Sequence, residues 1–280
     1  MTTVGIINPG AMGTSIAASA RAAGHDVLWV SAGRSAATRQ RAAEQDLREV
    51  DTLAQLCAAC DIILCVCPPH AAEAVADAVI AASFSGLYCD GNAISPQKAM
   101  SIAERMGAAG IDFVDGSIIG PPAWQSGSTR FYLSGPSAGQ VAALFAGTLT
   151  EAIAIGAEVG KASALKMTFA ALTKGSTALL SAIYGTAENL GVRDELEREW
   201  AMRSAEAVEQ RRNQVRGVTS KAWRFAGEMQ EIAATFELAG LPPGFFEAAF
   251  EVYTRLAGFK DAESVPELEA VLGALMNEGR

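Results

Sequence analysis

Short apolar runs alternate with helix-like stretches along the first half of this chain. The runs have the length of buried strands, and they span residues 3–8, 26–30, 61–67, 86–90 and 111–115. Stretches with helical spacing, such as residues 71–82, separate them. Repeated alternation of strand and helix favours a parallel sheet with helices on both faces. Two later apolar runs, at residues 131–134 and 152–156, predict two further strands.

The pattern changes after Gly160. The rest of the chain is rich in Ala, Leu, Glu and Arg, and it holds no convincing strand pattern. Residues 161–190 form one long helical pattern. The sequence therefore predicts an α/β domain with a doubly wound parallel sheet over residues 1–158. An all-α domain follows over residues 159–280, and it begins with a long interdomain helix.

The first predicted strand leads into a glycine-bearing turn, Asn8-Pro9-Gly10-Ala11-Met12-Gly13, which opens the first helix. In parallel sheets, such a turn binds a pyrophosphate at the helix N-terminus. Gly10 would let the backbone approach the phosphates, and Gly13 would let the helix pack closely against the strand. Asn8 replaces the first glycine of the usual fingerprint, and Asn tolerates left-handed dihedral angles better than most residues. We expect a dinucleotide here, with a purely structural turn as the alternative.

The end of the second predicted strand indicates which dinucleotide is bound. NAD enzymes usually place an acidic residue there to hold the ribose diol. Residues 27–43 contain no acidic residue, and the side chains that could instead bind a 2′-phosphate are Ser31, Arg34 and Ser35. Arg39 and Arg41 also lie here, although arginines at these positions can simply form a solvated helix face. The sequence thus favours NADP(H) over NAD(H).

The charge balance and the scarcity of histidine exclude some classes of partner and of active site. The 31 acidic residues outnumber the 22 basic ones, which argues against a nucleic-acid partner. With only 2 His, a histidine-rich metal site is impossible. His25 precedes a strand, at the end of a parallel sheet where ligands do not bind, whereas His70 follows a strand end and is a candidate for ligand contact.

We expect a cytoplasmic chain with no signal segment and no membrane span.

The cysteines offer a metal site as a rival interpretation. Their spacing is poor for four zinc ligands, and a buried cysteine is commonly a small hydrophobe. We therefore expect no metal at the candidate set Cys57, Cys60, Cys65 and Cys67.

Several segments together resemble the β-hydroxyacid dehydrogenases, which include 3-hydroxyisobutyrate dehydrogenase and, more distantly, 6-phosphogluconate dehydrogenase. Residues 5–13 look like the glycine turn of that family, and residues 90–96 look like its Asp-x-Ser-Thr-x-x-Pro stretch near the nicotinamide. Residues 115–121 resemble its Asp-Ala-Pro-Val-Ser-Gly-Gly substrate loop, and residues 156–174 resemble the start of its long helix with the catalytic lysine. Residues 221–229 are similar to a less characterised C-terminal domain of phosphogluconate-dehydrogenase-like proteins. The resemblance implies a Rossmann-type domain followed by an all-α domain.

The resemblance also implies site residues. Lys166 would be the catalytic proton donor and acceptor, and a lysine on an apolar helix is costly to bury without such a task. Lys174, about 80° away around the helix, is the alternative base. The residues that would position the substrate are Asn92, Ser117 and Thr173. At the end of the strand predicted over residues 61–67, the residues that would contact the cofactor, again with Asn92, are Cys67, Pro68 and Pro69.

Two positions depart from the family pattern. Ile119 replaces a serine and Ala170 replaces an asparagine, both of which would hydrogen-bond a hydroxyacid. We expect hydride transfer, dependent on NADP(H), to or from a small hydroxyacid or semialdehyde. An imine reductase is the first alternative, because a less polar pocket suits an amine, and a non-catalytic dinucleotide-binding protein is the second.

The apolar character of the long helix predicts a homodimer, because one chain has difficulty covering so much apolar surface. Aromatic residues of the helical domain are expected in its core, although Trp223 or Phe246 could line the substrate pocket.

Overall fold

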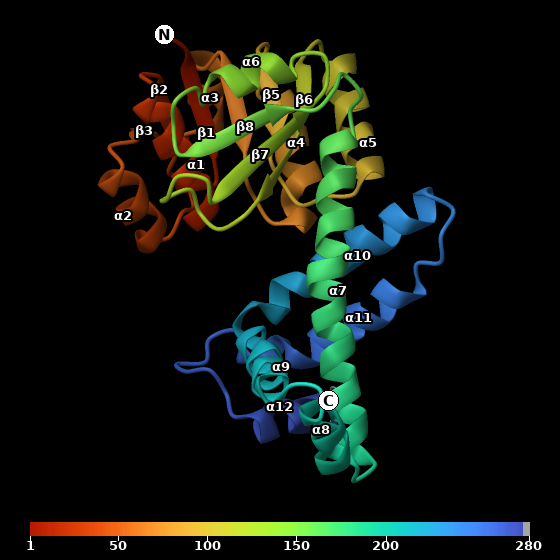
Figure 1. The fold of residues 1–280 in the computed structure, drawn as a ribbon. Helices are drawn as coiled ribbons and strands as arrows, with labels where there is room; N and C mark the ends of the chain where they lie inside the picture. The colour runs from red at the N-terminus through yellow and green to blue at the C-terminus, as the bar shows by residue number, and fades with distance from the viewer. Residues whose placement is uncertain (277–280) are drawn as a thin grey trace. The chain divides into compact units, whose positions relative to one another are not determined.

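The computed structural model describes residues 1–276, and it divides into two compact units, Met1–Met167 and Thr168–Arg280. The first unit holds an eight-stranded sheet in the order β3-β2-β1-β4-β5-β6-β7-β8 (Figure 1). The strands from β3 to β6 in this order are all parallel, β7 is antiparallel to β6, and β8 is parallel to β7. Their bounds are β1 Thr3–Ile7, β2 Asp26–Val30, β3 Arg48–Val50, β4 Ile62–Cys65, β5 Leu87–Asp90, β6 Asp112–Ile119, β7 Thr129–Ser134 and β8 Thr150–Ala154.

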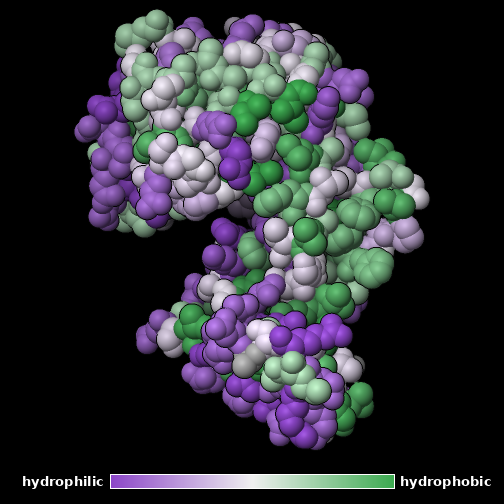
Figure 2. Space-filling view, viewed as in Figure 1, coloured by the Kyte–Doolittle hydropathy of each residue, from purple (hydrophilic) through white to green (hydrophobic). Residues whose placement is uncertain are grey.

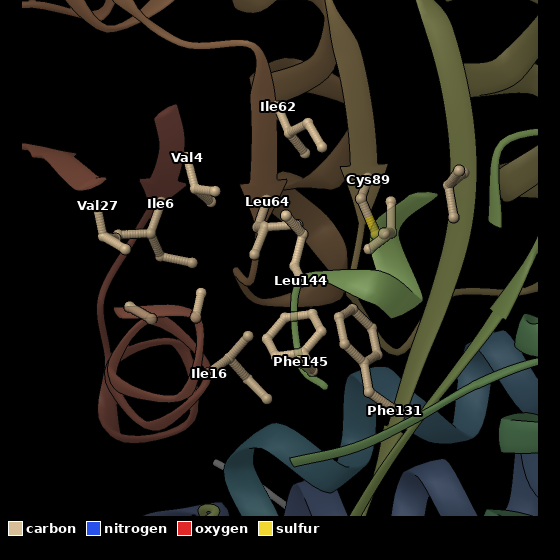
Figure 3. Close-up of a cluster of buried hydrophobic side chains, with 14 of the residues drawn as sticks. Val4, Ile6, Ile16, Val27, Ile62, Leu64, Cys89, Phe131, Leu144 and Phe145 are labelled. Carbon is tan, nitrogen blue, oxygen red and sulfur yellow. The ribbon is translucent and has the colours of Figure 1, made fainter. Parts of the chain in front are cut away.

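Helices pack on both faces of the sheet because its strands alternate their apolar side chains between two cores. One core joins strand residues such as Val4 and Ile6 to Ile16 of α1 and to Phe145 (Figure 3). The other joins residues such as Ile63 to α3, α4 and α5. The expected doubly wound sheet is confirmed. The helical elements of this unit are α1 Ala11–Ala22, α2 Ala36–Glu44, α3 Leu53–Ala59, η1 Pro69–Ala71, α4 Ala72–Ala81, α5 Pro96–Ala108 and α6 Ala138–Ala143.

One strand was not expected, and several others have different bounds; β4 ends at Cys65 and β7 begins at Thr129, for example. The short edge strand β3 was not predicted, because Arg48 and Glu49 are exposed and leave no apolar run. The strand expected at residues 111–115 continues to Ile119 as β6, since its second half pairs with β7. The last strand, expected at residues 152–156, is Thr150–Ala154.

The second unit is helical. The long helix expected over residues 161–190 is confirmed as α7, Lys161–Asn189, whose residues up to Met167 belong to the first unit. Aromatic pairs link α10 to α11, with the ring centroids of Phe236 and Phe246 lying 4.5 Å apart. No strand follows β8 in the part of the chain that the structure describes. The remaining helical elements are α8 Arg193–Ala201, α9 Ala205–Gly217, α10 Thr219–Leu238, α11 Gly244–Leu256, η2 Ala257–Phe259 and α12 Leu268–Met276.

Across residues 1–276, no helix combines the length and the apolar character needed to cross a membrane.

Candidate active site

One row of residues marks the edge of the sheet at which predicted site residues gather. The register of four neighbouring strands places one residue of each in this row: Ile7, Cys65, Asp90 and Asp115. The predicted residues that follow the row by one or two positions are Asn8, Cys67, Asn92 and Ser117. Ligands of open parallel sheets bind at the carboxyl ends of the strands, which is this edge. The fold therefore brings predicted site residues from four separate segments to one edge of the sheet.

The β1–α1 turn has the backbone that the sequence predicts. Asn8 adopts a left-handed φ of 64°, and its side-chain amide donates to the carbonyl of Val66 at 3.1 Å. A Cβ atom on Gly13 would lie 2.7 Å from the carbonyl oxygen of Asn8, so only glycine lets α1 pack this closely. A Cβ atom on Gly10, by contrast, would meet no heavy atom within 4 Å. The space beside Gly10 and the first N–H groups of α1, which have no partner inside the helix, fit a phosphate group.

The other residues of this turn lie in the first turn of α1 or just before it. Ala11 is exposed, and Met12 is partly buried against the core. The carbonyl of Pro9 accepts a hydrogen bond from the hydroxyl of Thr14 at 2.8 Å, which ties the turn to the helix.

Arg34 connects the β2–α2 loop to the β1–α1 turn. Its guanidinium Nη1 donates to the side-chain oxygen of Asn8 at 3.0 Å. Its Nε is buried and has no hydrogen-bond partner within residues 1–276. A cation with a spare donor beside the turn is suited to bind an anionic group.

Ser35 and Arg39 have structural partners, and Ser31 is buried. Ser35 caps α2 by accepting from the N–H of Thr38 at 3.3 Å, and Ser31 is buried. Arg39 forms an ion pair with Glu49 at 2.7 Å and donates to the carbonyl of Ser31. The residues over α2 are largely hydrophilic at the surface, as a solvated helix face would be (Figure 2).

Asn92 binds the end of β4. Its side-chain oxygen accepts from the backbone N–H of Cys67 at 2.5 Å, and its amide nitrogen lies 3.6 Å from the sulfur of Cys65. Pro68 and Pro69 follow directly and lead into η1. The side chain of Asn92 is buried, so these contacts fix the ends of β4 and β5 relative to each other.

Asp90 is a buried carboxyl group that sequence reasoning missed. Its Oδ1 accepts from the backbone N–H of Asn92 at 2.9 Å, and its Oδ2 has no partner among the described residues. Burial raises the pKa of Asp90 to about 7, and the neighbouring carboxylate of Asp115 adds to the increase. The available signal was its position at the end of a predicted buried strand.

Lys166 lies on α7 within the first unit, and its ammonium contacts β6. Its Nζ donates to the carbonyl oxygen of Ile118 at 2.7 Å. The preceding residue on the strand, Ser117, is fully buried, and its hydroxyl has no hydrogen-bond partner within the described chain. Lys166 on α7 therefore contacts the strand that carries Ser117, another predicted site residue. Ile119, next along β6, is also buried.

The alternative base, Lys174, lies in the helical unit and contacts other residues of that unit. It forms a buried ion pair with Glu228, and its Nζ lies 4.4 Å from the ring centroid of Phe225. Burial lowers the pKa of Lys174, whereas Glu228 acts in the opposite direction. Thr173 is exposed, and its hydroxyl donates to carbonyls one turn earlier. Their assignment to the site stays a prediction.

The two aromatic residues considered for the pocket differ in exposure. Phe246 is buried and packs on Phe236. Trp223 is partly exposed, with the ammonium of Lys260 lying 4.4 Å from its ring centroid.

The two histidines lie at different edges of the sheet, and two of the cysteines lie close together. His25 accepts from the backbone N–H of Thr2 at 3.4 Å, at the opposite edge of the sheet, and His70 is exposed in η1. The sulfur atoms of Cys65 and Cys67 lie 3.7 Å apart. Among residues 1–276, no group of three or more metal-ligating side chains is found.

The first unit matches the model of the NAD-binding domain of 6-phosphogluconate dehydrogenase over residues 3–144. The chain belongs to this family. Membership agrees with the geometry of the β1–α1 turn and gives a nicotinamide dinucleotide as the class of cofactor. Residues 187–256 match a second model, a domain of unknown function (DUF1932). No curated protein sequence matches the chain.

Solved structures resemble the chain over nearly its whole length. A conserved hypothetical protein from Sinorhizobium meliloti 1021 is 26% identical, with a TM-score of 0.68 over 98% of this chain and 96% of the other. Mycobacterium tuberculosis 3-hydroxyisobutyrate dehydrogenase is 18% identical, with a TM-score of 0.69 over 99% and 100%. An imine reductase from Myxococcus stipitatus in complex with NADP⁺ is 19% identical, with a TM-score of 0.55 over 98% and 100%. The last two likenesses show a fold shared by hydroxyacid dehydrogenases and imine reductases.

Proposed function

We propose that this chain is an NADP(H)-dependent oxidoreductase that acts on a small hydroxyacid or semialdehyde, with Lys166 as proton donor and acceptor. The observation that carries the proposal is the single edge of the sheet described above. It holds a turn that fits a dinucleotide, the buried amide of Asn92, and, on β6, the carbonyl that binds Lys166. In the reduction of a carbonyl the hydride goes to the carbon, so a proton donor is needed near the oxygen, and an ammonium group can serve as that donor.

Different residues at this edge would bind the cofactor, transfer the proton and orient the substrate. The β1–α1 turn and the N-terminus of α1 would hold the pyrophosphate of the cofactor, with Gly10 leaving room for it. When bound, the nicotinamide supplies or accepts a hydride. Lys166 would give a proton to the substrate oxygen during reduction and remove it during oxidation. The hydroxyl of Ser117 and the amide of Asn92 would orient the substrate.

A panel of substrates tests the function. NADPH oxidation is measured with small semialdehydes and with cyclic imines, and the reverse reaction is measured with hydroxyacids. Turnover with semialdehydes supports the proposal, and turnover with imines alone supports the imine reductase alternative. Ile119 favours that alternative, because an apolar side chain is buried where the resembling dehydrogenases have a serine. Tight NADPH binding without turnover on any compound would support a non-catalytic binding protein.

Arg34 is proposed to select NADP(H). Replacing Arg34 with alanine should raise the Kd for NADPH by about tenfold or more, because a charge-assisted contact to a phosphate contributes about 1.5–3 kcal/mol. The Kd for NADH, which has no 2′-phosphate, should change far less. Fluorescence titration with both cofactors measures the two values. Arg41→Ala, on the neighbouring helix, is the matched control, and equal losses for both cofactors in Arg34→Ala would contradict the assignment.

We also propose that the helical unit dimerises. Exposed apolar side chains, including Leu172, Leu179 and Phe245, line a groove of about 700 Å³ between α7 and α11. A second copy presents the same apolar surface, so a two-fold arrangement would cover both at once. Size-exclusion chromatography with light scattering should give twice the chain mass of 29.1 kDa. A monomer at micromolar concentration would overturn this proposal.

A further inference from the structure

The first turn of α7 is held by a carboxylate that belongs to β6. Asp115 is fully buried, and it accepts hydrogen bonds from the backbone N–H of Ser163 at 3.0 Å and from its hydroxyl at 2.6 Å. The hydroxyl of Ser134 donates to the same carboxylate at 3.0 Å. That hydroxyl also accepts from the backbone N–H of Ala162 at 3.0 Å.

These contacts form a helix cap supplied by other elements. The first N–H groups of a helix have no partner inside the helix, and a negative charge there is favourable. Asp115 and Ser134 serve the N–H groups of Ser163 and Ala162, so the first turn of α7 is bound to two neighbouring strands. A buried carboxylate with these three donors is a directional anchor, because its oxygen atoms fix both the place and the rotation of the turn.

The anchor lies close in sequence to the contact made by Lys166. Lys166 follows Ser163 by three residues, which is just under one helical turn, so the two side chains share a face of α7. Ile118 likewise follows Asp115 by three residues along β6. The same strand therefore binds the same helix twice, first through the carboxylate of Asp115 and then through the carbonyl that accepts from Lys166.

We propose that Asp115 is a positioning residue for Lys166. It holds the first turn of α7 in the rotation that places the ammonium at the end of β6, and Ser134 and Ser163 complete the anchor. The proposal rests on the proposed function in so far as Lys166 is the proton donor. Ångström-scale misplacement of a catalytic group costs up to about a hundredfold in rate, so the anchor acts on turnover without touching the substrate.

The test compares Asp115→Asn with Asp112→Asn, which changes an exposed carboxylate at the start of the same strand. Asp115→Asn replaces one acceptor oxygen with an amide donor, so one of its contacts is lost. We expect kcat to fall by about tenfold to a hundredfold while the Kd for NADPH stays within about twofold. In a Lys166→Ala background the same change should cost almost nothing further, because Asp115 acts through Lys166. A further loss of equal size in that background would overturn the proposal, since it would show a merely structural role.

A second measurement does not depend on activity. Reductive methylation followed by peptide mass spectrometry reports how accessible the amine of Lys166 is. The amine should react faster in Asp115→Asn than in wild type, and at the wild-type rate in Asp112→Asn. If Asp115→Asn does not fold, Ser163→Ala takes its place as the test variant. It keeps every charge, and it should also make the Lys166 amine react faster, though by less. Unchanged labelling overturns the positioning role, whereas full activity in Lys166→Ala overturns the proposed function instead.

Discussion

Replacing Lys166 with alanine is expected to lower kcat for carbonyl reduction by about 10²–10⁴-fold, because general acid catalysis contributes about that much. The ammonium is held on β6 by the carbonyl of Ile118, the residue that follows the buried Ser117. The Kd for NADPH should stay nearly constant, since the residues proposed to hold the cofactor lie on other elements. Steady-state kinetics with the best substrate of the panel, together with fluorescence titration of NADPH, measures both quantities.

Two other lysines of α7 serve as comparisons. Lys161 is exposed at the start of the helix, and its replacement with alanine should leave kcat near the wild-type value. Lys174→Ala should instead reduce the stability of the helical unit by about 3–5 kcal/mol, because it leaves the buried carboxylate of Glu228 without its partner. If Lys174→Ala abolished turnover in a folded protein while Lys166→Ala kept it, the role of proton donor would pass to Lys174.

Asp90→Asn is expected to stabilise the folded chain at pH 8 and to have little effect at pH 4. The pKa of Asp90 is about 7 in the folded chain, against 3.8 as its ordinary value, because burial disfavours the charged form. Between these two values the folded state binds a proton that the unfolded state has released, so stability falls as the pH rises. Each pH unit in this window costs about 1.4 kcal/mol, which sums to as much as about 4 kcal/mol. An asparagine has no charge to bury and avoids this loss.

The measurement is urea unfolding of wild type and Asp90→Asn at several values between pH 4 and pH 8. The two stability curves should diverge as the pH rises and run parallel above the pKa of Asp90. Asp112→Asn, at an exposed carboxylate, should follow wild type throughout. Parallel curves for wild type and Asp90→Asn over the whole range would mean that folding leaves the pKa of Asp90 at its ordinary value, which would contradict the prediction.

Local patterns in the sequence predicted the features that depend on local structure. The alternation of apolar runs with helical stretches gave the doubly wound sheet, and the identity of residue 8 indicated its left-handed backbone. The edge strand β3 could not be seen in this way, because Arg48 and Glu49 face solvent and leave no apolar pattern. The extension of β6 was missed for a different reason, since it depends on pairing with β7 across a loop.

Contacts between distant segments were beyond the reach of such patterns. The carbonyl of Ile118 and the ammonium of Lys166 are 48 residues apart in the chain, and nothing in either segment alone indicates the contact. The burial of Asp90 also depends on distant segments, because its position at the end of an apolar run does not show that Cys65 and Asp115 lie beside it in neighbouring strands. Its pKa follows from the packing of the strands around it and from Asp115 in the adjacent strand.

Asn8 supplies more than a substitute for a glycine backbone. Its side-chain oxygen accepts from Arg34, which no glycine could offer, and so it holds the guanidinium beside the turn before any ligand arrives. A long side chain that is already ordered gives up less conformational entropy when an anion binds than one that moves freely in solvent. The exchange of glycine for asparagine would thus preorganise Arg34 for the 2′-phosphate that we propose it binds.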